Sequence, residues 1–359
     1  DIKVFYCNMP DCFISRFYVD IKNKRTEAKK EGKKLKKIYY QMVGLFASFS
    51  FKILKSVYKY IPLPKGKYNC FFSPVARFDK RIKRDKKLKR FLTLHDVTPI
   101  VMNYPDKKWI IRILKSLNKK DYYVCNSNYT KSDFLKYSKN IDENKINTCY
   151  SAYDNNRFKP QSIEDINLVK KKYGLEGKKY IFSLCNIFPH KNLIRMVRTY
   201  IQFIKKNNID DLYFLMGGAN GSTYKDEFEQ ELKNFDEFKD KIIRPGYIDD
   251  EDVPKLYSGA ECFVYTSCNE GFGVPPLEAM ASGCPVITSN NSSLPEIVGD
   301  AGIMIDYDSD EQHVEAYEKY YFNPDIRAEY IQKGLEHVKI FSWKKSADII
   351  ADIMEKVVD

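Results

Sequence analysis

Residues 269–286 read NEGFGVPPLEAMASGCPV, and apolar runs at 262–265 and 285–288 mark the two ends of this stretch. Both runs have the length and composition of buried strands. The proline pair at 275–276 suits the first turn of a helix, where a missing N–H costs little, and Gly283 suits its C-terminal cap. The stretch is therefore predicted to form a strand, a tight loop, a helix and a second strand.

Two carboxylates lie on either side of this loop. Glu270 precedes the loop, and Glu278 lies about one turn inside the predicted helix. The first N–H groups of a helix have no partner within it and carry the positive end of its dipole, so an anion can bind there. In a purely structural role, Glu278 would be favoured by the helix dipole and Glu270 would be a solvated loop residue. In a ligand-binding role, Glu278 would accept hydrogen bonds from a ribose diol, and Glu270 would hold sugar hydroxyls or balance charge at an anomeric carbon.

Strand and helix patterns alternate through the second half of the chain. Strands are predicted at 180–185, 212–216, 241–244, 262–265, 285–288 and 303–305, with helices at 193–205, 251–257 and 276–281. This alternation predicts a doubly wound parallel sheet, and two further helices, 324–339 and 343–358, close the chain.

The first half has a weaker pattern. Strands are predicted at 1–6, 91–94, 122–125 and 147–150. Composition turns polar over 155–177, and a prior of about 150 residues per domain gives two domains for this length. We place them at 1–160 and 161–341, followed by a final helix at 342–359.

The charge balance indicates an anionic partner. The chain has 60 basic and 48 acidic side chains, a net charge of +12, which suits nucleic acid, a phospholipid surface or a phosphorylated ligand. Nine basic residues lie within 22–37, before a helical apolar pattern at 38–53, and nine more within 77–90. The first cluster fits either a core helix with a solvated start or a helix on an anionic membrane. A nucleic-acid site would need interleaved aromatic residues, and the second cluster has only Phe78.

Nine cysteines are scattered without a Cys-x-x-C pair or zinc-type spacing. This predicts buried thiols in a reducing compartment and no metal site. The longest uncharged run, 38–51, is short of the ~20 residues that a membrane span needs, and we recognise no signal peptide. We therefore expect a cytoplasmic protein, peripheral at most on the inner face of the plasma membrane.

Three further positions fall at predicted strand ends. Lys191 lies just before a helix and could neutralise phosphate, although on its own it would pass for an exposed lysine. Gly217 could let a ligand approach the backbone. His95 ends the strand at 91–94 and could equally be a turn or capping histidine. Because carboxyl ends of parallel strands meet along one crevice, we expect these residues to converge with the loop at 269–274.

Ordered motifs in the second half resemble the group 1 (family 4) retaining glycosyltransferases of GT-B fold. They are RPGYI at 244–248, YTS at 265–267, EGFGVPPLEAMA at 270–281, GCPVI at 283–287, SLPE at 293–296 and DAG at 300–302. The hallmark is Glu-x7-Glu, formed by Glu270 and Glu278. The likeness extends to PHKNL at 189–193 and, more thinly, to HDVTP at 95–99, and it nearly vanishes before Phe91.

The resemblance implies an α/β protein with two Rossmann-like domains facing an interdomain cleft, and a C-terminal helix crossing back to the first domain. The first domain would be the acceptor side, and the second would hold most of the nucleotide-sugar donor. The implied roles are Glu278 on ribose, Lys191 on the diphosphate, the amides of Phe272, Gly273 and Val274 on sugar and phosphate, Glu270 on the donor sugar, Tyr247 and Ile248 beside the base, and His95 toward the reacting sugar.

Two departures from the family pattern affect these expectations. Many members have Gly-Arg where this chain has Cys185-Asn186, so the family's second phosphate cation is missing or supplied elsewhere. Asn186 then takes that place in the donor site, and Lys191 must carry more of the charge. The family's glycine-rich loop after the first strand is also absent, and we expect that strand to precede Asp1.

The family implies an enzyme that moves a mannose- or glucose-type hexose from a UDP- or GDP-sugar to a glycan or lipid-linked acceptor in cell-surface polysaccharide synthesis, for example of lipopolysaccharide. Retention without a metal or cofactor is implied, with a departing phosphate oxygen deprotonating the acceptor. The glutamate pair is therefore not a glycosidase pair. The sequence DSD at 308–310 resembles a metal motif of another fold and is predicted to be a loop aspartate pair. The alternatives are a non-catalytic glycan-binding subunit, a sugar-nucleotide epimerase and a nucleic-acid binder.

Overall fold

The computed structural model describes residues 69–74, 88–218 and 224–358. The chain divides into two compact units, residues 1–71 with 77–89 and residues 72–76 with 90–359. The second unit contains nearly all of the described residues. The sequence-predicted elements at 1–6, 22–37 and 38–53, and most of the basic cluster at 77–90, lie outside the described residues.

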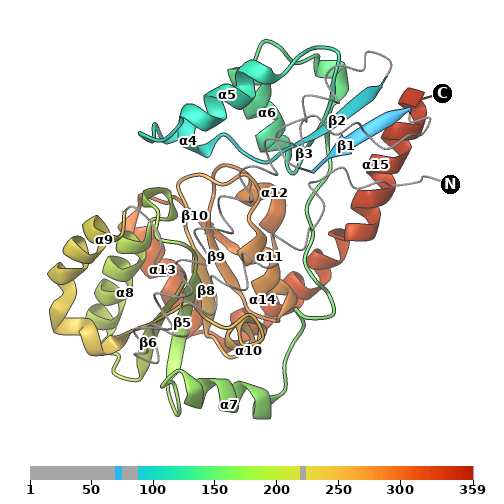
Figure 1. Ribbon diagram of the computed structural model, residues 1–359. Helices are drawn as coiled ribbons and strands as arrows, with labels where there is room; N and C mark the ends of the chain where they lie inside the picture. Colours follow the sequence, from blue (N-terminus) through green and yellow to red (C-terminus); the bar gives the residue numbers. More distant parts are fainter. Residues whose placement is uncertain (1–68, 75–87, 219–223, 359) are drawn as a thin grey trace, which may run out of the picture. The chain divides into compact units, whose positions relative to one another are not determined.

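A six-stranded parallel sheet is the larger of the two sheets that the described residues form (Figure 1). Its strands are β5 (Lys179–Leu184), β6 (Leu212–Gly217), β7 (Ile242–Gly246), β8 (Cys262–Tyr265), β9 (Val286–Ser289) and β10 (Ile303–Ile305). The order is β10-β9-β8-β5-β6-β7, and all neighbours pair in parallel. The chain enters at β5, runs outward to β7 and returns to β8 on the other side of β5. Such a reversal opens a crevice at the carboxyl ends of β5 and β8, where α/β folds bind ligands.

Helices cover both faces of this sheet. On one face lie α8 (Leu193–Asn207) and α13 (Asp310–Tyr321), and on the other lie α10 (Val253–Ser258) and α11 (Val274–Ala281). Tyr200 and Tyr317 are almost completely buried in the first interface, and Leu277 in the second. The strands are thus buried on both sides, which explains why they are continuous apolar runs and do not alternate with polar residues.

The smaller sheet has four strands, in the order β1-β2-β3-β4. They are β1 (Cys70–Ser73), β2 (Lys89–Leu94), β3 (Tyr122–Cys125) and β4 (Ile146–Thr148), accompanied by α4 (Thr98–Val101), α5 (Lys108–Ser116) and α6 (Asn128–Tyr137). The pairs β2–β3 and β3–β4 are parallel. The carboxyl end of β2 carries His95, and that of β3 leads into Ser127, whose side chain caps α6 by accepting a hydrogen bond from Thr130 N.

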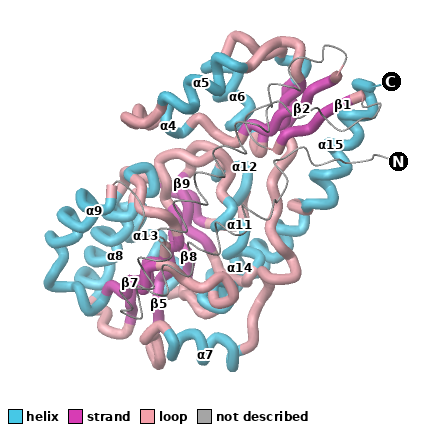
Figure 2. Tube along the Cα trace, viewed as in Figure 1, coloured by secondary structure: helices cyan, strands magenta, loops and turns pink. Residues whose placement is uncertain are grey.

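The remaining described helices complete the alternation of strand and helix (Figure 2). They are α7 (Ile163–Lys172), α9 (Lys225–Leu232), α12 (Leu294–Val298), α14 (Pro324–His337) and α15 (Trp343–Val358), with 3-10 segments at Glu143–Lys145, Pro189–Lys191, Lys233–Lys241 and Val338–Ile340. Among the residues that the structure describes, no helix is both long and apolar enough to cross a membrane.

The predicted strands and helices between 180 and 305 are present, with ends shifted by a few residues. Several described helices were given no range from the sequence, among them α5, α7 and α13. α7 falls within the polar stretch at 155–177, where of its ten residues only Val169 is buried. α13 begins inside the DSD sequence, so the prediction of a loop aspartate pair is wrong for Asp310. The predicted strand at 147–150 also ends earlier, at Thr148.

Candidate active site

A pocket of about 470 Å³ is lined by residues that follow the ends of β2, β3, β5, β6, β7 and β8. Most of the residues singled out from the sequence line it, namely His95, Asn186, Lys191, Tyr247, Ile248, Glu270, Phe272, Gly273 and Val274. Asp96 and Gly218, the chain neighbours of His95 and Gly217 at predicted strand ends, also line the pocket. Tyr265, Asn126 and Asp250 line it as well, and no role was assigned to them from the sequence. The structure thus brings the predicted side chains together, while the role of each one stays a prediction.

Lys191 and Glu270 form an ion pair in this pocket. Lys191 lies at the end of the 3-10 turn before α8, and its Nζ is 2.6 Å from Glu270 Oε1 and 2.6 Å from the hydroxyl of Tyr265. The two charged side chains are only 15% and 12% exposed. Burial raises the pKa of Tyr265 well above its usual value, so its hydroxyl keeps its proton. The arrangement keeps a desolvated ammonium group, with Glu270 as its partner, beside the amino end of α11.

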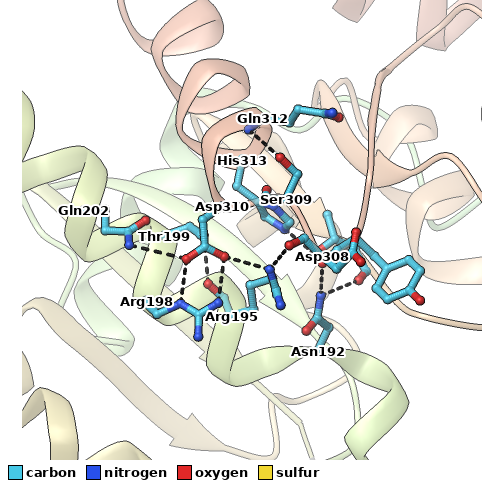
Figure 3. Close-up of polar contacts among 12 residues, drawn as sticks. Asn192, Arg195, Arg198, Thr199, Gln202, Asp308, Ser309, Asp310, Gln312 and His313 are labelled. Carbon is cyan, nitrogen blue, oxygen red and sulfur yellow. Dashed lines mark hydrogen bonds and ion pairs between the residues drawn. The ribbon is translucent and has the colours of Figure 1, made fainter.

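The turn that carries Lys191 is tied to the end of β8. Asn192 has a left-handed backbone with φ 58°, and its Nδ2 donates to the carbonyls of Thr266 at 3.1 Å and Tyr307 at 2.6 Å (Figure 3). The amide of Cys268 donates to the His190 carbonyl at 2.7 Å. These bonds fix Lys191 relative to the loop that leads to Glu270, and no sequence pattern indicated them.

Asp310 binds arginines of α8 and so joins two helices of the same layer (Figure 3). Its carboxylate accepts from Arg195 at 2.8 Å and from Arg198 at 2.7 and 2.8 Å. Ser309 caps α13 by accepting from Gln312 N at 3.3 Å. The side chain of Asp310 therefore serves packing of α13 on α8, and the metal resemblance of the DSD sequence has no support in these contacts.

The loop from Glu270 to Val274 contains two glycines that are needed for different structural reasons. Gly273 precedes α11 with φ 114°, a conformation that suits glycine. Gly271 lies so close to the end of β2 that a Cβ there would be 2.5 Å from the His95 carbonyl oxygen. α11 begins at Val274 without a side-chain cap hydrogen bond, and Pro275 and Pro276 have no backbone N–H. Of its first three residues, only Val274 therefore has an N–H that a ligand could use.

Glu278 lies one turn further along α11 and is not among the lining residues of the pocket. Burial raises its pKa to about 7; Arg157 lowers the pKa and Asp250 raises it. Arg157 donates to the carbonyl of Asp250, which does line the pocket. Arg157 is thus a further cation near this end of the sheet. No sequence pattern indicated it, because it lies in the polar stretch at 155–177.

Gly217 and His95 each have a close neighbour that the sequence did not indicate. A Cβ at Gly217 would collide with the side chain of Ile248. The absence of a side chain at Gly217 therefore leaves room for Ile248 in the pocket wall. His95 is exposed in the pocket wall, and its Nε2 is 2.9 Å from the carbonyl of Pro74. A direct contact of either residue with a ligand stays a prediction.

The comparisons with known proteins agree with this geometry. Residues 165–337 match the family model described as "Glycosyl transferases group 1". The chain is 30% identical over 258 residues to "O-antigen chain mannosyltransferase B" of Escherichia coli, covering 70% of this chain and 66% of the relative. It is 28% identical over 239 residues to "O-antigen chain mannosyltransferase RfbU" of Salmonella typhimurium, covering 65% and 61%. Among solved structures, that of Anabaena Alr3699/HepE in complex with UDP and glucose superposes with a TM-score of 0.69 at 15% identity, covering 88% of this chain and 83% of that one.

The fold and site define a GT-B protein built on parallel sheets. The chain belongs to the group 1 glycosyltransferases. It spans just under two thirds of the length of the two O-antigen mannosyltransferases that it matches. Domain boundaries at 160 and 341 stay a prediction.

Proposed function

We propose that the protein is a retaining, metal-independent hexosyltransferase of cell-surface polysaccharide synthesis. It would move a hexose from a nucleotide-diphospho-sugar to a glycan or lipid-linked acceptor. The observation that carries the proposal is the buried Lys191–Glu270 pair, which shares one pocket with the amino end of α11 in a member of this family.

Charge develops on the leaving diphosphate as the glycosidic bond to the donor breaks. Lys191 and the backbone N–H of Val274 at the start of α11 offset that charge, and such prearranged groups are usually the largest catalytic contribution. The donor's phosphate competes with Glu270 for Lys191 Nζ. Glu270 is then available to the hydroxyls of the donor sugar or to the positive charge at its anomeric carbon.

Retention follows without a protein nucleophile. We propose that a departing phosphate oxygen takes the acceptor's proton on the same face from which it leaves. In this scheme the bond from the anomeric carbon to phosphate breaks as the bond to the acceptor oxygen forms.

Mannose is the sugar that the comparisons favour. Both O-antigen relatives are named as mannosyltransferases, and GDP is one of the two nucleotide carriers that the family resemblance implies. Tyr247, 64% exposed, and Ile248 would lie against the base, and Glu278 would accept from the ribose. We therefore propose GDP-mannose as the first donor to test and UDP-glucose as the second.

A calorimetric panel of GDP- and UDP-sugars tests the donor, and NMR of the product's anomeric proton tests retention. We expect one donor to bind and be turned over equally with and without EDTA, giving the donor's anomeric configuration. An inverted product, or activity lost with EDTA, would overturn the corresponding part of the proposal. Binding of a donor without transfer would instead favour the non-catalytic subunit, the alternative that Asn186 supports. Interconversion of free sugar nucleotides would favour an epimerase.

We also propose that the acceptor side lies against an anionic membrane on the cytoplasmic side. α5 buries Ile110, Ile113 and Leu114, and its outward face exposes Lys108, Trp109, Arg112 and Lys115. Lysine and arginine near an anionic surface each contribute about 1 kcal/mol, and tryptophan suits the lipid interface. Lipid-linked acceptors would then be within reach of the protein.

A further inference from the structure

The amino end of α6 is hydrogen-bonded to the loop that contains Glu270. Ser127 Oγ donates to the Gly271 carbonyl at 2.7 Å, and Thr130 Oγ1 donates to the same carbonyl at 2.9 Å. Both residues are almost completely buried. One carbonyl next to Glu270 therefore receives two hydroxyl donors from a turn that follows β3.

Glu296, on α12, binds the first turn of α6. Its Oε2 accepts from Asn128 N at 2.8 Å and its Oε1 accepts from Tyr129 N at 2.7 Å. Tyr150 adds a third donor at 3.2 Å. A carboxylate at the positive end of a ten-residue helix is favourable, so this contact joins α12 firmly to α6.

Asn269, the residue before Glu270, makes two further hydrogen bonds that hold the loop. Its Oδ1 accepts from the hydroxyl of Tyr129 at 2.8 Å, and its Nδ2 donates to Thr98 Oγ1 at 2.8 Å. Asn269 is only 2% exposed, so these bonds are shielded from water. Both chain neighbours of Glu270 are thus fixed by side chains from the four-stranded half of the unit.

Stability alone does not explain the hydrogen bonds that converge on the loop 269–272. Buried polar contacts often contribute little net stability relative to apolar packing, so we interpret these bonds as fixing the position of the loop. Gly271 shows the same closeness, because any side chain there would meet the His95 carbonyl and Asp96 Cβ. The pocket residue Asn126 directly precedes Ser127, and the carbonyl of His95, also a pocket residue, lies 3.1 Å from Thr130 Oγ1.

We propose that Glu296 is a positioning residue for sugar transfer. Together with Ser127 and Thr130 it sets the loop 269–272 against the strand ends that carry His95 and Asn126. The role rests on the proposed function, since the loop matters only if Glu270 and its neighbours hold the donor.

The test uses the whole chain and three variants. Glu296→Gln keeps the size but replaces one acceptor oxygen with an NH2 group that cannot accept from the α6 amides. Thr130→Val removes one hydroxyl at similar volume. Glu315→Gln, exposed on α13, is the matched control. Each is measured for kcat, for GDP and UDP affinity by calorimetry, and for amide hydrogen exchange at 128–129 and 269–272.

We expect kcat to fall about tenfold to a hundredfold in Glu296→Gln and Thr130→Val, because small misplacements at a reacting centre have effects of this size. Nucleotide affinity should stay within about twofold, and exchange at 269–272 should become faster. The control should match wild type in all three.

A folded Glu296→Gln protein with wild-type kcat, or with unchanged exchange at 269–272, would overturn the positioning role. If Glu296→Gln fails to fold, Thr130→Val decides by the same criteria. If wild type transfers no sugar from any donor, the proposed function fails separately. The exchange comparison then still decides whether Glu296 holds the loop.

Discussion

Lys191 is the residue on which the proposed chemistry depends most. Asn186 stands where the family resemblance implies a second phosphate cation, and Arg157, a further cation near the site, contacts Asp250 and lies near Glu278. Lys191 could be singled out from the sequence because it sits directly before a helix in a motif. Arg157 could not, because its position follows from tertiary packing of a segment with no pattern of its own.

Replacing Lys191 with methionine should lower kcat by about a hundredfold to a thousandfold, the usual loss when one charge-stabilising group is removed. Glu270 would also lose its partner, and some stability with it. Lys171→Met, on the exposed face of α7, is the control and should behave as wild type. Steady-state kinetics with the accepted donor provide the measurement. A folded Lys191→Met protein with near-normal kcat would contradict the assignment.

Donor affinity should depend on pH through Glu278. Burial raises its pKa to about 7, so the carboxyl is largely neutral below that pH and ionised above it. The ionised form accepts hydrogen bonds from a ribose diol more strongly. Nucleotide affinity should therefore rise between pH 6 and pH 8, and the rise should be lost in Glu278→Gln. A titration with the same slope in both proteins would refute a ribose contact.

The raised pKa of Glu278 should make the folded protein less stable as pH rises, although the same rise in pH should make donor binding stronger. The folded pKa of Glu278 lies above its unfolded value of 4.5, so between these values the folded state binds more protons. Its contribution to the free energy of unfolding falls as pH rises through this window. Glu278→Gln should remove that dependence and make the protein relatively more stable at pH 8. Denaturant unfolding at pH 5 and pH 8 measures the difference.

At the scale of elements, strong apolar runs were predicted well and amphipathic surface helices poorly. β8 and β10 were located to the residue because both are short, apolar and bounded by polar turns. α13 was missed because its buried residues, His313 and two tyrosines among them, do not form an obvious apolar stripe. The site was predictable where one motif holds it, as at Glu270. Contacts between distant elements, such as Glu296 with α6, were not.

Asp310 gives a test at this scale. Because it joins α13 to α8 through two arginines, Asp310→Asn should lower the free energy of unfolding by about 1 kcal/mol, as expected for a partly exposed ion-pair network. The kcat should stay within about twofold, since these contacts lie outside the pocket. Thermal unfolding and kinetics with and without EDTA check this. A large loss of kcat at unchanged stability would instead indicate that the DSD sequence has a role in catalysis.

At the scale of the whole molecule, the net charge of +12 and the outward face of α5 predict salt-dependent binding to anionic vesicles. Sedimentation with phosphatidylglycerol vesicles should pull the protein down at low salt and release it at high salt. Replacing Lys108, Arg112 and Lys115 together by glutamine should weaken the binding. Equal binding to neutral vesicles would contradict an electrostatic contact, and salt-dependent RNA binding in place of vesicle binding would favour a nucleic-acid partner.

We propose that the Lys191–Glu270 pocket holds and activates a nucleotide-sugar donor. The most direct measurement is transfer of labelled mannose from GDP-mannose, or glucose from UDP-glucose, to a lipid-linked glycan acceptor by wild type and by Glu270→Ala. We predict transfer by wild type with retained configuration and a loss of at least about a hundredfold in the folded variant. Equal transfer by the two proteins would contradict the account.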